Sequence, residues 1–254
     1  MNNVDLVKKY VNGVFSDFLD FMNITMLLPI DIEVFSMSPA DIKNGIYGVP
    51  ASHQYDVLKD SHKLKIWEKS CDARLNFSHL IFHELTHAYD TDRYAKKNKI
   101  RYAAIKGYSE FHAAQIEMLK LIGAPNINNV PPFLMDKKLK VLATETTVVE
   151  YLRSSQNTMS QSVQKYKYDN DISRISTILG LIFNHLGRIT ICQRYAINFK
   201  KYQKEFSDNI YPKEYCGDKY NLIEKLCQNT MTELSIECLM GIYLQIVTKK
   251  SKCP

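Results

Sequence analysis

Hydrophobic and polar residues change their spacing along the chain in a way that separates predicted strands from predicted helices. Apolar side chains at helical spacing predict an amphipathic first helix over residues 4–22. Residues 30–34 alternate apolar and charged side chains, which predicts a half-buried strand, and residues 64–67 repeat that pattern more briefly. Residues 44–50 predict another short strand, bounded by Gly and Pro.

The rest of the sequence shows mainly helical periodicity. One helix is predicted over residues 76–97, with Asn76 as its N-cap, and a second over residues 108–121 before a Gly-Ala-Pro sequence. Beyond residue 132 the pattern predicts no strand; it predicts further helices at residues 134–154, 172–199, 222–227 and 231–247. We therefore expect an α+β fold, with a small mixed sheet in residues 1–125 and an all-helical portion in residues 126–254.

Composition narrows the class of protein. With 45% apolar residues and only 9 Gly and 8 Pro, the 254-residue chain is neither collagen-like nor disordered. Its longest apolar stretch, residues 175–187, is too short to span a bilayer, and the N-terminus shows no signal-peptide pattern. We therefore expect an intracellular, cytoplasmic protein or one that is delivered without a recognisable signal peptide. The net charge of +6 is spread along the chain, which disfavours a nucleic-acid partner, and six cysteines without a CxxC pair are expected to be free thiols. The oligomeric state cannot be read from the sequence.

One short motif combines residues that can bind a metal ion and activate water. His83, Glu84 and His87 form an HExxH sequence within the predicted helix over residues 76–97. Residues four apart share a helix face, so the two imidazoles can bind one zinc ion. Glu84 lies on the flank of that face, where its carboxylate can act as a general base on water without binding the metal.

A catalytic zinc site needs a third protein ligand, and three acids are candidates. Glu110 lies near the start of the next predicted segment, and Ala113 and Ala114 on its helix face permit a close approach to the HExxH helix. Glu117, two turns further along the same face, is a rival ligand or a partner that orients one. Asp90, one turn after His87, is also a candidate for orienting a ligand. The sequence favours Glu110 as the ligand.

These residues resemble the gluzincin type of zincin metallopeptidases, in which HExxH is followed by a helix that carries ExxA. The likeness is closer to the mitochondrial ATP-synthase-assembly metallopeptidase family, whose motif reads HELxHAYDxCR and then EIRAA. Residues 83–93 read HELTHAYDTDR and residues 110–114 read EFHAA, with Asp92 at the cysteine position of that family. The resemblance implies a zincin-like core that binds Zn²⁺ and hydrolyses peptide bonds. It also implies that substrate lies along an edge strand, for which Ile46, Tyr47, Gly48 and Val49 are the candidates.

The sequence thus predicts a zinc-dependent metalloendopeptidase that acts on a protein or peptide, with Glu84 as the base and His83, His87 and Glu110 as ligands. Two alternatives stay open: a non-catalytic binding protein with a zincin fold, and a metal-dependent hydrolase of another substrate such as nucleic acid. The oxyanion that develops during hydrolysis needs an O–H or N–H donor. Chemically suitable side chains are Tyr89, Tyr108, Tyr151, His185 and Tyr195.

Overall fold

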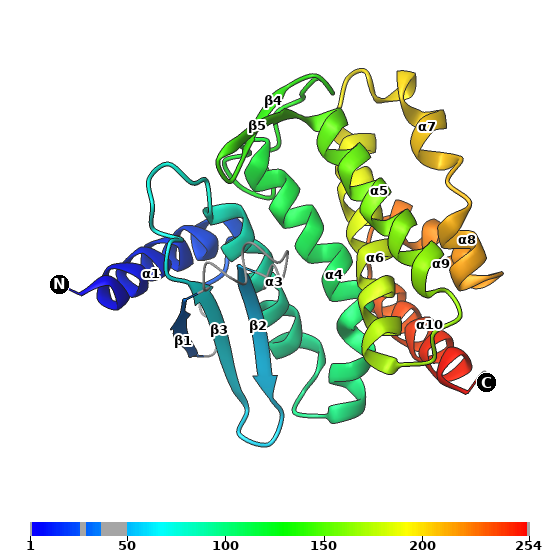
Figure 1. Cartoon of the computed structure of the whole chain (residues 1–254), viewed down its shortest axis with the longest axis horizontal. Helices are drawn as coiled ribbons and strands as arrows, with labels where there is room; N and C mark the ends of the chain where they lie inside the picture. The colour runs from blue at the N-terminus through cyan, green and yellow to red at the C-terminus, as the bar shows by residue number, and fades with distance from the viewer. Residues whose placement is uncertain (1, 26–28, 37–49, 253–254) are drawn as a thin grey trace.

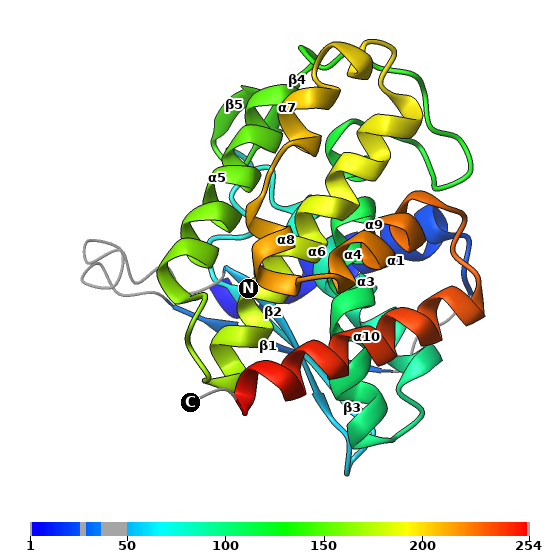
Figure 2. The same ribbon diagram turned by 90° about the vertical axis from the view of Figure 1, so that its right-hand side faces the viewer.

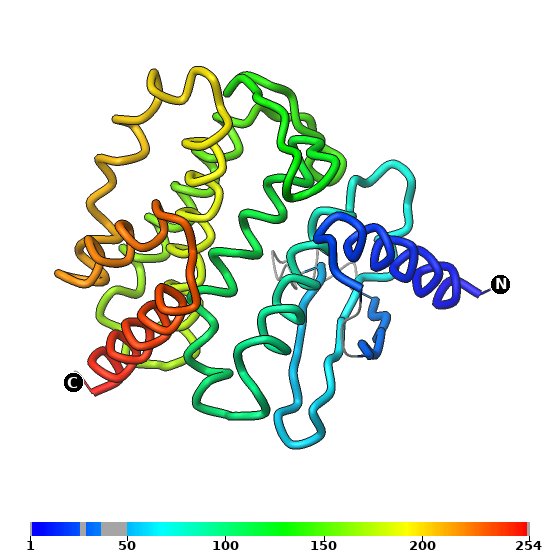
Figure 3. Tube along the Cα trace, turned by 180° about the vertical axis from the view of Figure 1, so that it is seen from behind, coloured from blue at the N-terminus to red at the C-terminus, as the bar shows by residue number. Residues whose placement is uncertain are grey.

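The computed structural model describes residues 2–25, 29–36 and 50–252. A three-stranded sheet and the first helices lie at one side of the molecule, and the helices of the C-terminal part lie at the other (Figures 1 and 3). This arrangement is a mixed α+β fold. Its first half contains α1 (Asn3–Met22), β1 (Ile30–Phe35), β2 (Ala51–Asp56), β3 (Ser61–Trp67), α3 (Ser78–Tyr94) and α4 (Lys99–Leu121).

The sheet has the strand order β1-β3-β2. β1 runs parallel to β3, with Ile32 opposite Leu64, and β2 runs antiparallel to it, with His53 opposite Leu64. The predicted strands at residues 30–34 and 64–67 are confirmed, whereas β2 was not predicted. Within the described sheet β2 is an edge strand, and it packs against α3, so it is the strand next to the HExxH helix.

The helix α3 begins later than the sequence pattern predicts. Its first residue is Ser78, and the preceding Phe77 caps it with a helical backbone and no side-chain hydrogen bond. The prediction that Asn76 is the N-cap is therefore wrong. The Asn76 amide instead donates to the Lys140 carbonyl at 2.7 Å, and its backbone N–H donates to the Leu142 carbonyl at 3.1 Å. A tertiary contact with a distant hairpin has replaced local capping.

That hairpin corrects the expectation of an all-helical C-terminal portion. Strands β4 (Lys138–Val141) and β5 (Thr144–Thr147) pair antiparallel, in a segment predicted to be helical over residues 134–154. Leu142 turns the chain with a φ of 52°, and the Thr-rich β5 consists largely of β-branched residues, which fit a strand better than a helix. The helix starts only after Thr147, whose side chain accepts from the Glu150 N–H at 3.3 Å.

The rest of the C-terminal part is helical, as predicted (Figure 2). The main helix α6 (Ile172–Tyr195) is long and apolar enough to cross a membrane. However, 67% of its most apolar window is buried inside the protein, as in a core helix. The five cysteines among the described residues are free thiols, as expected. The elements after the hairpin are α5 (Val148–Tyr166), α6 (Ile172–Tyr195), the 3₁₀ helix η1 (Phe199–Lys201), α7 (Gln203–Ser207), α8 (Tyr211–Cys216), α9 (Lys219–Gln228) and α10 (Glu233–Ser251).

Helix α4 joins the two sides of the molecule, because it packs on α3 and on α6. Ile116 and Met118 belong to a core shared with α1, the sheet and α3, whereas Ile105 and Phe111 belong to a core shared with α6 and α10. The first of these cores also includes Val148, which lies beyond the predicted division at residue 125. That division into two parts stays a prediction.

The contact between α4 and α6 depends on a glycine. A Cβ added at Gly187 would lie 2.3 Å from the Phe111 carbonyl oxygen and 3.0 Å from the Ala114 Cβ. Ala114 therefore permits a close approach to α6, which the sequence did not predict. We expect Gly187→Ala to lower the free energy of unfolding by about 1–3 kcal/mol, because overpacking forces the helices apart. Thermal melting measures the loss.

Gly241→Ala is the matched control for that change. Gly241 is also a helical glycine, but a Cβ there meets nothing within 4 Å. Since Ala favours a helix over Gly by roughly 0.5–1 kcal/mol, this variant should melt at the same or a higher temperature. Equal destabilisation by both substitutions would contradict the close approach at Gly187.

Candidate metal centre and cleft

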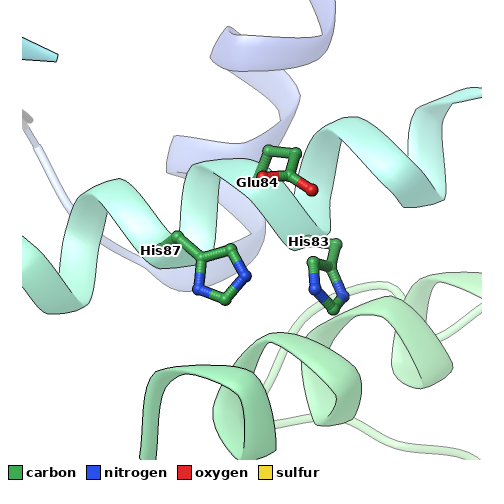
Figure 4. Close-up of side chains that lie close together, drawn as sticks. All are labelled: His83, Glu84 and His87. Carbon is green, nitrogen blue, oxygen red and sulfur yellow. The ribbon is translucent and has the colours of Figure 1, made fainter. Parts of the chain in front are cut away.

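Helix α3 brings the HExxH side chains together as its periodicity predicts. The ligand atoms of His83, Glu84 and His87 all lie within 4.8 Å of one another. Figure 4 shows the two imidazoles one turn apart on the same side of the helix. All three side chains are partly buried, so they face a cleft rather than open solvent.

Glu110 of α4 faces both imidazoles. Its Oε2 lies 3.6 Å from His83 Nε2 and 3.8 Å from His87 Nε2. In a tetrahedral zinc site with bonds of 2.0–2.1 Å, neighbouring ligand atoms are about 3.3 Å apart. The two measured separations exceed this value by only a few tenths of an ångström, so a small contraction would let Glu110 share an ion with either imidazole. Their role as ligands stays a prediction that this geometry favours.

The other nitrogen of each imidazole is hydrogen-bonded. His83 Nδ1 donates to Glu117 Oε2 at 3.0 Å, because an ionised carboxylate only accepts. His87 Nδ1 lies 2.7 Å from Ser109 Oγ, and Ser109 is also close enough to Asp90 to lower the pKa of that carboxyl. A hydroxyl has one hydrogen, so when Ser109 donates to Asp90 it accepts from His87 Nδ1–H. In that case His87 Nε2 carries a lone pair toward Glu110, and His83 Nε2 would carry one after losing the proton that its raised pKa retains.

Glu117 lies behind His83, away from the space between the Nε2 atoms and Glu110. It is 2% exposed and accepts hydrogen bonds from Tyr151 Oη at 2.5 Å and from Arg188 Nη2 at 2.9 Å. Burial raises the pKa of Glu117, but Arg188 and His83 hold it well below its usual value. Of the alternatives left open by the sequence, this geometry favours Glu117 as a residue that orients His83.

Asp90 is fully buried and accepts from His112 Nδ1 at 2.9 Å. It lies near His87 only through Ser109, which the sequence analysis did not identify. Burial raises the pKa of Asp90, and its hydrogen bonds with His112 and Ser109 oppose that rise. Asp90 is thus placed to orient His87 through Ser109 and not to bind metal directly.

The charges of the facing groups suit a metal site. Burial lowers the pKa of His87 to about 4, so its imidazole is neutral. Burial opposes ionisation of Glu110, but His87 and His83 bring its pKa down to about 2, which keeps the carboxylate anionic. Burial also lowers the pKa of His83, but hydrogen bonds with Glu110 and Glu117 outweigh it and raise that pKa to about 10. A metal ion would displace this proton, since ligands bind metal deprotonated.

Glu84 lies beside the two imidazoles and is also bonded to the backbone of β2. Its Oε2 accepts from the backbone N–H of His53 on β2 at 2.7 Å. Burial raises the pKa of Glu84 to about 7, whereas the charge of His83 lowers it. A carboxylate with a pKa near neutrality can both take up and release a proton, which is the behaviour of a general base.

The cleft has a volume of about 820 Å³ and is lined by residues of β2, α3, α4, α6 and α10. Asn184 of α6 donates to Glu110 Oε2 at 2.9 Å, and Gly180 leaves room for that carboxylate, since a Cβ there would lie 3.4 Å from Oε1. Sequence reasoning missed Asn184, although a polar residue within the apolar stretch at 175–187 was a usable signal.

The substrate-strand candidates Ile46–Val49 lie outside the described residues; the strand beside the site is β2, whose Ser52 and His53 line the cleft. The five candidates for an oxyanion donor do not line it. Tyr151, for example, is bound to Glu117 behind His83, and Tyr108 stacks on His112. Among the cleft-lining residues, Tyr102, Lys106 and Tyr243 are donors that the sequence did not single out.

Comparisons of the chain with protein-family models, with curated proteins and with solved structures give no match.

Proposed function

We propose that the protein is a zinc-dependent metallopeptidase that hydrolyses peptide bonds in a protein or peptide substrate. One observation carries the proposal: two imidazole Nε2 atoms face the Glu110 carboxylate, and a second carboxylate, Glu84, lies in the same cleft and is free to act as a base when Glu110 supplies the third ligand. A site that only binds a structural metal has no use for such a base.

His83, His87 and Glu110 would hold the zinc ion, which supplies a Lewis acid that polarises the scissile carbonyl and acidifies water. Glu84 removes a proton from the attacking water and returns it to the leaving nitrogen. The His53 N–H keeps the Glu84 carboxylate directed into the cleft during both steps. Glu117 and Ser109 fix the orientation of the two imidazoles.

The substrate would lie along β2. This strand is the edge of the described sheet on the side of α3, and Ser52 and His53 line the cleft. An extended peptide can add to such an edge through main-chain hydrogen bonds, which bind substrates without demanding a particular side chain. Specificity would then come from the cleft wall formed by α4, α6 and α10.

Metal analysis tests the ligand assignment. Protein purified without chelator should contain about one zinc ion per chain, and His83→Ala or His87→Ala should lose it, because each removes one of three ligands. Glu145→Gln is the control, since Glu145 is 74% exposed on the β4–β5 hairpin and touches none of these residues. Wild-type protein that takes up no zinc even when it is supplied would contradict the proposal.

A parallel assay distinguishes the proposed activity from the two alternatives. Zinc-loaded protein is incubated with casein and with RNA, with and without 1,10-phenanthroline. We expect casein cleavage that the chelator abolishes and added zinc restores, and no cleavage of RNA. Cleavage of RNA alone would indicate a nuclease, and zinc binding without any cleavage would indicate a binding protein.

A further inference from the structure

A chain of hydrogen bonds runs across three elements toward the cleft. Asp92 Oδ1 on α3 lies 2.6 Å from His62 Nε2 on β3, and His62 Nδ1 lies 2.7 Å from His53 Nε2 on β2. The His62 side chain is 0% exposed, so the middle of the chain is shielded from water. The chain ends at His53, which lines the cleft.

The chemistry of its first member sets the direction of this chain. An ionised carboxylate only accepts, so His62 presents Nε2–H to Asp92. With both rings neutral, each has a single N–H; His62 Nδ1 then accepts, and His53 donates from Nε2. His53 Nδ1 is left with a lone pair.

His53 also holds the catalytic base. Its backbone N–H donates to Glu84 Oε2 at 2.7 Å, and its ring lies nearly parallel to that of His87, with centroids 6.4 Å apart. The nitrogen that receives a proton from Glu84 must come within hydrogen-bond reach of this carboxylate. It therefore comes beside His53.

We infer that Asp92, acting through His62, holds His53 in the tautomer whose Nδ1 accepts a hydrogen bond from the leaving nitrogen of the substrate. This inference rests on the proposed peptidase activity and assigns a substrate contact to His53 and positioning roles to His62 and Asp92. None of these roles follows from the HExxH motif.

The step is balanced without a proton transfer to His53. Water adds its oxygen to the carbonyl carbon, Glu84 takes a proton from that water and gives it to the nitrogen, and the C–N bond breaks. The nitrogen keeps its original hydrogen and gains one. His53 Nδ1 accepts a hydrogen bond from one of these N–H groups. This hydrogen bond orients the nitrogen lone pair toward Glu84 and becomes stronger as the amine forms.

Nuclear magnetic resonance tests the tautomers directly. Long-range ¹H–¹⁵N correlation spectra of zinc-loaded protein should show His53 and His62 both protonated at Nε2, with assignments from His53→Gln and His62→Phe. This readout does not depend on activity. A His53 ring protonated at Nδ1 would overturn the inference, because that nitrogen would be a donor and could not accept the substrate N–H.

Matched amide and ester substrates test the contact. An ester has no N–H on its leaving atom, so His62→Phe and Asp92→Asn should lower kcat for the amide by about 10–100-fold and for the ester by less than about 3-fold, with unchanged zinc content. Asp92→Glu should restore much of the amide activity, since it keeps an acceptor-only carboxylate. The control is Tyr55→Phe, which removes a hydroxyl bonded to Asp60 beside the chain but no bond within it.

The outcomes separate this inference from the proposed function. Equal losses on the amide and the ester would overturn the role of His53 and leave the peptidase activity standing. Zinc-loaded wild-type protein that cleaves neither substrate would overturn both. A melting curve recognises a variant that fails to fold. If His62→Phe fails to fold, the amide and ester rates are compared in Asp92→Asn instead, because Asp92 lies at the partly exposed end of the hydrogen-bond chain.

Discussion

Glu84→Gln should reduce peptide hydrolysis by about 10²–10⁴-fold while zinc content and melting temperature change little. The substitution removes the proton acceptor that activates water, which is the contribution expected of a general base. Its amide oxygen can still accept from the His53 N–H, so the local fold is retained. Initial rates on a quenched-fluorescence peptide, with the zinc content of the same samples, measure the effect.

Glu145→Gln is the control for that variant. Glu145 lies on the β4–β5 hairpin with a side chain 74% exposed and only a 3.9 Å ion pair to Lys138. We expect it to hydrolyse the peptide at the wild-type rate. Unchanged turnover in Glu84→Gln would remove the mechanism proposed for this cleft, whatever the metal content.

Glu110→Ala should weaken zinc binding more than any other single acid-to-alanine change. It removes a ligand that faces both Nε2 atoms at 3.6 and 3.8 Å. Glu117→Ala should weaken zinc binding by only about 10–100-fold, since Glu117 orients His83 from behind. Asp90→Ala should act in the same smaller range, through Ser109. Competition with a chromogenic chelator gives the affinities.

A second substitution at Glu117 is needed because Glu117→Ala leaves Arg188 buried without its carboxylate partner. Loss of one member of a buried ion pair costs about 3–5 kcal/mol, which endangers folding. Glu117→Gln keeps a hydrogen-bond acceptor for Arg188 and His83 and serves as the milder substitution. If Glu117→Gln released the zinc while Glu110→Ala retained it, the assignment of the third ligand would be wrong.

Local spacing was sufficient for the core of the candidate site. His83 and His87 share a helix face because residues four apart always do, and the structure brings them together with Glu84 as that rule predicts. The strands at residues 30–34 and 64–67 followed from alternation: Leu64 and Ile66 form the buried face of β3, whereas β1 is partly buried on both faces. Glu110 followed from its position on the next helix. These features depend on the chain within a few turns of each residue.

Several errors came from segments in which local pattern and tertiary contact disagree. β2 reads Ala-Ser-His-Gln-Tyr-Asp, without apolar alternation, and becomes a strand because β3 pairs with it. The hairpin over residues 138–147 interrupts an expected helix, and Asn76 leaves its expected cap position to bond with that hairpin. In each case a partner distant in sequence supplies the hydrogen bonds that the local pattern does not specify.

The sequence by itself determined which residues share the helix face that carries the motif. The tertiary structure adds which imidazole nitrogen each carboxylate meets once α4 is packed between α3 and α6, and this geometry favours Glu110 over Glu117 as the proposed ligand. The tertiary structure also forms the hydrogen-bond chain from Asp92 through His62 to His53, which joins a helix to two strands. Periodicity fixes the direction of a side chain around its own helix or strand, whereas the atom it meets is fixed by the packing of elements far apart in sequence.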